Sequence, residues 1–211
     1  MTIDNFFNVA GFMSFENEND FYHIQIISRK KDNGVKDFGI KEYSVRSVES
    51  FYKIENEIKQ MCEMFNARAY VYVNRRNYKN IAMKMIKELS DIVCDENYKK
   101  CKQAFKSCCG KYSSAGDSKI WIIDVDVAYE KAIDSVGDAV HAIIMNDEKV
   151  RERYVDKIRT RSGWHFLIRP CDTRQLNMTL DQMQCHFNDI IKEVDIKRDN
   201  MTLLYYKEPA K

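Results

Sequence analysis

The chain has 211 residues, with 34 basic and 32 acidic side chains and a formal net charge of +2. Its 45% hydrophobic and 12% aromatic content excludes a disordered protein. No apolar run approaches the roughly 20 residues that span a bilayer, and residues 1–7 lack the pattern of a signal peptide. We therefore expect a cytoplasmic protein without a membrane partner. Because its charges nearly balance, any nucleic-acid surface must come from local segregation of charge.

The seven cysteines suit the reducing cytoplasm, where thiols persist. Cys94, Cys101, Cys108 and Cys109 lie in a stretch of helical pattern, at spacings of seven, seven and one. Structural zinc sites usually contain short Cys-x2–4-Cys pairs, and this spacing has no two such pairs. We expect these cysteines to be buried rather than to bind zinc.

In chain order, the first predicted elements are a strand, a turn and a helix. The strand covers residues 21–28, where apolar and polar residues alternate. The run Asp32-Asn33-Gly34 is typical of a hairpin turn. Apolar residues then recur at helical spacing over residues 47–65, with Ser47 or Ser50 as the N-cap.

A second strand is predicted over residues 67–74, followed by helices over 78–94 and 96–109. Arg68 and Tyr70 share one face of this strand, which leads into Arg75 and Arg76. Arginine and aromatic side chains suit contact with the phosphates and bases of nucleic acid. The alternative is a solvated sheet face whose arginines pair with nearby glutamates.

After a predicted linker over residues 110–118 comes the strand around which the chain is organised. Four apolar residues, 120–123, run directly into Asp124 and Asp126. Alternate residues of a strand share a face, so the two carboxylates point the same way and repel each other. A divalent cation such as Mg²⁺ or Mn²⁺, which prefers oxygen ligands, would keep both ionised. The alternative is a strand that ends here, with both acids in a solvated turn.

The remaining elements give the C-terminal part its predicted fold class. A helix is predicted over residues 128–145, followed by two strands joined by a turn at Ser162-Gly163, a helix, and two closing strands. The order strand, helix, strand, strand, helix, strand is the split βαβ arrangement of RRM-like and polymerase palm domains. We therefore predict an α+β protein. The two strands joined by the turn are predicted at 155–161 and 164–169, the helix that follows them at 176–188, and the two closing strands at 190–196 and 202–207.

The turn between the first two of those strands has functional chemistry of its own. Gly163 allows a sharp turn and close approach to a ligand, and Arg161, Ser162 and His165 flank it. A guanidinium, a hydroxyl, an imidazole and free backbone amides together suit a triphosphate. Taken alone, a histidine at a strand edge is more often structural.

A third carboxylate is expected near the C-terminus. Asp199 lies in a predicted turn between the last two strands, and Asp195 lies in the strand before it. A turn can direct a carboxylate into a cleft, which favours Asp199 as a further metal ligand over Asp195. The alternative for Asp199 is an Asx-type turn beside Asn200.

These three blocks, in this order, resemble the archaeo-eukaryotic primase superfamily, in particular its small stand-alone bacteriophage members. The resemblance rests on Ile122-Ile123-Asp124-Val125-Asp126, on Ser162-Gly163-Trp164-His165, and on Asp199 with the residues up to Tyr205. It covers about residues 64–207. One departure is that Asp199 follows charged residues, whereas the family's late acid follows an apolar one.

The resemblance implies a two-lobed primase-like fold and a DNA primase or primase-polymerase that makes short primers on single-stranded DNA. Residues 1–117 would form an amino-terminal lobe that contacts the template, and residues 118–211 an RRM-like catalytic lobe. The implied partners are nucleoside triphosphates and a separate replicative helicase, in the host cytoplasm if a phage encodes the protein. The implied site residues are Asp124, Asp126 and Asp199 for two Mg²⁺ or Mn²⁺ ions, Arg161, Ser162, Gly163 and His165 for the triphosphate, and Arg68, Tyr70, Arg75 and Arg76 for the template.

Other readings remain open from the sequence alone. Ile122–Asp126 also resembles the first motif of haloacid-dehalogenase-type phosphatases, but no later Asp-Asp pair follows it to close their metal site. The Asp-x-Asp of metal-dependent glycosyltransferases leaves the Gly-x-His turn unexplained. A catalytically inactive, nucleic-acid-binding replication accessory protein of the same fold is the non-enzymatic alternative.

Overall fold

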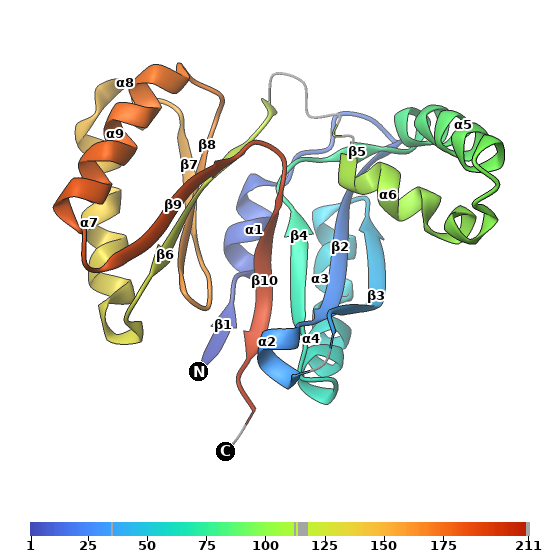
Figure 1. Ribbon diagram of the computed structural model, residues 1–211, viewed down its shortest axis with the longest axis horizontal. Helices are drawn as coiled ribbons and strands as arrows, with labels where there is room; N and C mark the ends of the chain where they lie inside the picture. The colour runs from blue at the N-terminus through green and yellow to red at the C-terminus, as the bar shows by residue number, and fades with distance from the viewer. Residues whose placement is uncertain (35, 112, 114–117, 210–211) are drawn as a thin grey trace.

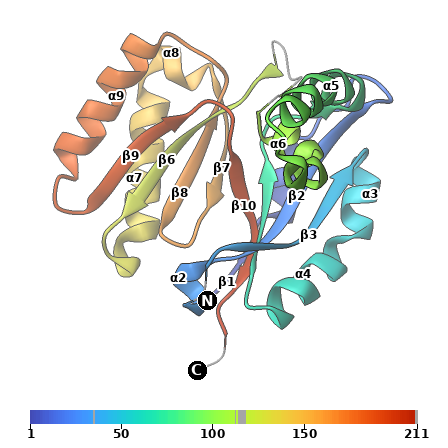
Figure 2. The same cartoon turned by 45° about the vertical axis from the view of Figure 1, so that its right-hand side comes forward.

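The computed structural model describes residues 1–34, 36–111, 113 and 118–209. It is an α+β fold built on two antiparallel sheets that lie side by side (Figures 1 and 2). Most of the predicted linker, residues 110–118, lies outside the described residues. No helix in the described ranges has the length and apolar character needed to cross a membrane.

The first sheet has the strand order β1-β10-β4-β2-β3, with the short β5 paired to β2. Helices α1, α3 and α4 cover one face, where β2 and β4 bury alternate apolar residues. Helices α5 and α6 cover one end of the other face, where the rings of Phe21, Tyr78 and Phe105 stack. The bounds are β1 Thr2–Asp4, β2 Asp20–Ser28, β3 Phe38–Val45, β4 Arg68–Tyr72, β5 Arg76–Asn77 and β10 Met201–Lys207, with α1 Phe6–Phe12, α3 Val48–Lys53, α4 Glu55–Met64, α5 Tyr78–Cys94, η1 Tyr98–Gln103 and α6 Ala104–Lys111.

The predicted hairpin turn at 32–34 is confirmed. A short helix, α2 (Lys30–Asn33), ends at Gly34, whose φ of 78° lies in the left-handed region that glycine adopts much more readily than other residues. The chain then returns as β3, antiparallel to β2. The sequence pattern did not predict β3, because this edge strand is mostly exposed and so carries no regular apolar alternation.

The predicted helix over residues 47–65 is two helices, α3 and α4, that meet at Ile54. Ser47 is the N-cap of α3, as predicted, and forms a reciprocal capping box with Ser50. The prediction that the cysteines are buried is confirmed for Cys108 and Cys109 and is wrong for Cys94 and Cys101, which are exposed.

The second sheet has the strand order β7-β8-β6-β9 and the predicted element order β6-α7-β7-β8-α9-β9. Its helices cover one face, onto which β6 directs Ile123, Val125 and Val127. Asp124 and Asp126 therefore lie on the opposite face, which is turned toward the first sheet. The bounds are β6 Trp121–Val127, β7 Tyr154–Arg159, β8 Gly163–Ile168 and β9 Ile191–Lys197, with η3 Glu130–Ala132, α7 Ile133–Asn146, α8 Glu148–Arg151 and α9 Thr173–His186.

Strand β10 belongs to the first sheet, although the sequence predicted it in the C-terminal lobe. We expected it to close the second sheet beside β9, but it pairs with β1 and β4 in the middle of the first sheet. There it buries Leu204 and Tyr205 in a core that also contains Ile122 and Leu167 of the second sheet. The two sheets thus share one core, and the division at residue 117 does not separate two independent structures.

Candidate active site

A cleft of about 280 Å³ opens between the two sheets. The second sheet lines it with the acidic pair of β6, with His165 of β8 and with Lys197 of β9. The first sheet contributes basic and aromatic side chains from β4 and from the segment around α2. The lining residues are Arg29, Lys31, Arg68, Tyr70, Asp124, Asp126, Thr160, Arg161, Ser162, His165, Lys197, Asn200, Met201 and Leu203.

Asp124 is held by two side chains from the neighbouring strands. Its carboxylate lies 3.1 Å from Nε2 of His165 and 2.8 Å from Nζ of Lys197. Burial alone raises the pKa of Asp124, but the hydrogen bonds and charges of His165 and Lys197 outweigh it and lower the pKa to about 2. The carboxylate is therefore ionised at neutral pH, and Lys197 is a site residue that the sequence did not reveal.

Asp126 lies two residues further along the same face. Its carboxylate accepts a hydrogen bond of 2.7 Å from the hydroxyl of Ser162. Next to Ser162, the backbone of β8 runs very close to that of β6. A Cβ on Gly163 would lie 1.8 Å from the carbonyl oxygen of Val125. Glycine is required here for this close approach between strands, and no left-handed backbone conformation is involved.

His165 links the two sheets. It pairs with Asp124 across β6 and β8, and its Nδ1 lies 2.9 Å from the hydroxyl of Thr202 on β10. Thr202 is fully buried. This hydrogen bond fixes the orientation of the imidazole, and it uses a strand that belongs to the first sheet.

A second link between the lobes centres on Asp32 of α2, whose side chain is only 1% exposed. Its carboxylate accepts two hydrogen bonds from the guanidinium of Arg68. It also lies 2.8 Å from Nη1 of Arg161, in the turn between β7 and β8. The sequence identified Asp32 only as a turn residue, because an ion pair between distant segments leaves no local pattern.

Two of the predicted nucleic-acid contacts lie elsewhere. Arg76 is fully buried and donates hydrogen bonds to the carbonyl oxygens of Cys109 and Asn74. Arg75 is 4% exposed and pairs with Glu16. Both guanidiniums are buried against internal partners and do not line the cleft, whereas Arg68 and Tyr70 do.

The structure does not bring Asp199 to the acidic pair. Its carboxylate lies 3.2 Å from Arg76 and accepts a hydrogen bond from Asn74, which also binds the backbone of Ile120. Asp124 is opposite Asp195 in the register of β6 and β9, so these two side chains share a face. Asp199 lies beyond the end of β9 at Lys197, in the bend before β10, and does not share that register.

The donor chemistry of the cleft fits a hard divalent cation, because Asp124 and Asp126 both supply carboxylate oxygens to it. Asp195, opposite Asp124 on β9, shares their sheet face but is not one of the residues that line the cleft. In the described residues, no three His, Cys, Asp or Glu side chains are already gathered closely enough to form a metal site. His165 and Lys197 contact the carboxylate of Asp124 instead.

Comparison with protein-family models, with curated proteins and with solved structures gave no match to this chain.

Proposed function

We propose that this protein is a template-directed nucleotidyltransferase, a DNA primase or primase-polymerase that makes short primers on single-stranded DNA. The observation that carries the proposal is the meeting of Asp124 and Asp126 with Arg161, Ser162 and His165 in one cleft between two sheets. These residues come from two separate sequence blocks. The strand order β7-β8-β6-β9 with helices on one face also supports a palm-like catalytic lobe.

In this proposal Asp124 and Asp126 hold the catalytic Mg²⁺ or Mn²⁺ ions. When bound, these ions activate the attacking hydroxyl and stabilise charge on the α-phosphate and the departing pyrophosphate. Asp195 replaces Asp199 as the third carboxylate, because it faces the cleft side of β9 at the level of Asp124.

Arg161, Ser162 and His165 orient the triphosphate beside the acidic pair. Thr202 orients the imidazole of His165, and Asp32 orients the guanidinium of Arg161. Both side chains are therefore already oriented before the triphosphate binds. Lys197 adds positive charge where the triphosphate and the pyrophosphate lie. Arg68 and Tyr70 contact the template at the opposite wall, and a separate helicase supplies single-stranded DNA.

The test is incorporation of labelled nucleotides on single-stranded DNA with Mg²⁺ or Mn²⁺. The wild-type protein should make short products, and the Asp126→Asn variant should make none while binding DNA normally. Lys30→Met, at an exposed α2 residue outside the cleft, is the matched control and should retain synthesis. Absence of metal-dependent synthesis by the wild-type protein would contradict the proposal.

A catalytically inactive nucleic-acid-binding relative is the second candidate. The observation that favours it is that Lys197 and His165 occupy both oxygens of Asp124. Under this alternative the protein binds single-stranded DNA without metal-dependent synthesis. Lys197→Ala, which frees one oxygen of Asp124, then produces no metal-dependent nucleotide incorporation either.

A further inference from the structure

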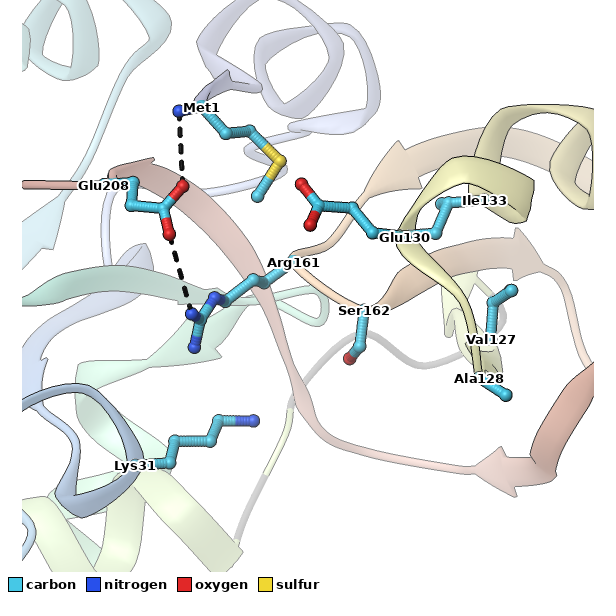
Figure 3. Close-up of a pocket in the computed structure, with 9 residues that line it drawn as sticks. All are labelled: Met1, Lys31, Val127, Ala128, Glu130, Ile133, Arg161, Ser162 and Glu208. Carbon is cyan, nitrogen blue, oxygen red and sulfur yellow. Dashed lines mark hydrogen bonds and ion pairs between the residues drawn. The ribbon is translucent and has the colours of Figure 1, made fainter. Parts of the chain in front are cut away.

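A second cavity, of about 230 Å³, adjoins the cleft (Figure 3). The two cavities share Lys31, Arg161 and Ser162, so these residues form the boundary between them. Beyond this boundary the second cavity is lined by the apolar side chains of Val127, Ala128 and Ile133 and by two carboxylates, Glu130 and Glu208. Together the two spaces fall within the roughly 300–1,000 Å³ range of small-molecule sites.

The two cavities differ in the chemistry that they offer. The cleft is lined by five basic side chains and two acidic ones, which suits a polyphosphate. The second cavity combines an apolar wall with carboxylates, which repel phosphate and accept hydrogen bonds from N–H and O–H groups. A ligand that spans both would place its phosphates at the boundary and in the cleft, and an uncharged part rich in hydrogen-bond donors beyond it.

Two side chains on opposite sides of the second cavity form no ion pair with any described residue. Lys31 is the only such cation in the lining of the cleft, since Arg29, Arg68, Arg161 and Lys197 each pair with a described carboxylate. Glu130 is the other; the nearby Arg159 pairs instead with Asp134, and Glu208 is held by Arg161 and the Met1 amine. Figure 3 shows Lys31 and Glu130 approaching the cavity from different elements.

A buried hydroxyl on the cleft side of the boundary also lacks a partner. Thr160 lines the cleft and is 8% exposed, and its side-chain oxygen is buried and has no hydrogen-bond partner among the described residues. A buried polar atom without a partner costs free energy unless a ligand or water satisfies it. Thr160 directly precedes Arg161, so this observation points to a ligand at the boundary.

We propose that the second cavity holds the base and sugar of a nucleoside triphosphate, with Lys31 and Arg161 binding its phosphates at the boundary. Glu130 accepts hydrogen bonds from the sugar or base. This inference rests on the proposed function and deepens it, because it assigns the nucleoside to residues of η3 and the end of β6, and gives the amino-terminal lobe a phosphate contact through Lys31.

The experiment compares the binding of ATP, GTP and inorganic triphosphate by calorimetry, with Mg²⁺ and without template. Ala128→Phe fills the second cavity and should weaken ATP and GTP binding about tenfold or more, while inorganic triphosphate binds as before. Glu130→Gln, which keeps the size of the side chain, should change nucleotide affinity in the same selective way. Lys31→Met should weaken all three ligands, because it removes a phosphate contact.

Matched controls are Ala142→Phe, at an exposed residue of α7, and Lys30→Met on α2, both outside the two cavities. Unchanged nucleotide affinity in both Ala128→Phe and Glu130→Gln would overturn the inference even if primer synthesis is observed. A Lys31→Met variant that weakened only single-stranded DNA binding would assign this contact to the template and also overturn it. If the selective losses are seen but the wild-type protein makes no primers, the inference stands and the proposed function fails.

Discussion

Asp124 combines two roles that its variants can separate. Under the proposed function it would hold a catalytic metal ion, and through His165 and Lys197 it also connects β6 to β8 and β9. Asp126 would share the first role, but among the described residues its side chain has only the hydrogen bond from Ser162 for the second. The sequence showed the pair but not this asymmetry, because the partners of Asp124 come from two other strands.

We expect Asp124→Asn and Asp126→Asn each to lower nucleotide incorporation at least about 100-fold, which is what losing even a supporting partner of a metal ligand can cost. Without metal, Asp124→Asn should also lower the free energy of unfolding by about 2 kcal/mol, because the pKa of Asp124 falls from 3.8 to about 2 on folding. Asp126→Asn should change it by less than about 0.5 kcal/mol.

The sign of this effect gives a pH test. A carboxyl group with a lowered pKa stabilises the fold above pH 3.8 and loses that contribution as the pH falls toward 2. Denaturant titrations with chelator present should therefore show the gap between wild type and Asp124→Asn closing in that range. A gap that is constant down to pH 2 would contradict the ion-pair account.

Asp195 and Asp199 should give opposite phenotypes. Asp195 is exposed, so Asp195→Asn should leave the melting temperature nearly unchanged and lower metal-dependent synthesis. Asp199→Asn leaves the fully buried Arg76 without its carboxylate partner, so it should cost about 1–3 kcal/mol of stability and spare the activity of the folded protein. The reverse pattern would restore Asp199 as the metal ligand.

At the scale of elements, two glycines control how the second sheet packs. A Cβ on Gly137 of α7 would lie 2.2 Å from Nε1 of Trp164, which donates a hydrogen bond to the carbonyl oxygen of Ile133. Gly163 sets the approach of β8 to β6 in the same way, but against backbone. The helix and the strand that carry these glycines were both predictable from periodicity, but the contact between the elements was not.

Gly137→Ala should therefore destabilise the protein by about 1–3 kcal/mol through overpacking, and Gly163→Ala by more, because the carbonyl oxygen of Val125 belongs to a strand that cannot move alone. Gly11→Ala is the control: it is also helical, has open space at its Cβ, and should be neutral or stabilising by up to about 1 kcal/mol. Thermal denaturation of the three variants checks this order.

The contact between α6 and the first sheet contains a buried histidine. His23 of β2 is 1% exposed and lies between Tyr72 and Phe105. Burial lowers its pKa to about 4; Glu42 opposes this effect, and Arg76 and Lys106 add to it. The folded protein thus keeps His23 neutral where the unfolded chain takes up a proton.

We expect the wild-type protein to lose about 3 kcal/mol of stability through His23 as the pH falls from 6.5 to 4, because only the unfolded state is protonated in that window. His23→Gln removes the titration and should flatten this part of the stability curve. Chemical denaturation at several pH values measures it; parallel curves for the two proteins would show that His23 is protonated in the fold.

At the scale of the whole molecule, β10 connects the two lobes into one folding unit. Because it lies between β1 and β4 and shares their core, we expect fragments 1–111 and 118–211 each to lack a cooperative thermal transition. Circular dichroism and amide proton spectra of the separate fragments, and of their mixture as a control for reassembly, test this. A cooperative transition in fragment 118–211 alone would show that the second sheet is an independent domain.

The sequence predicted what local periodicity encodes. Helix α5 was predicted with its observed bounds, and Asp124 and Asp126 were placed on a common strand face because side chains alternate along a strand. It could not predict the sheet that β10 joins, the burial of Arg76 or the ion pairs of Asp32. Each of these depends on partners distant in the chain. From sequence alone a charged residue is predicted to be exposed, because charged side chains are rarely buried unless they are paired.

The pairing of Thr2 with Lys207 also has a kinetic consequence. It joins residues at nearly opposite ends of the described chain, and in the first sheet β1 is connected to β4 only through β10, which lies between them. Closing so long a loop carries an entropic cost before any pairing offsets it, and folding slows as contacts become less local. Refolding from denaturant should therefore be limited by the arrival of β10, with the cleft forming only in that last step.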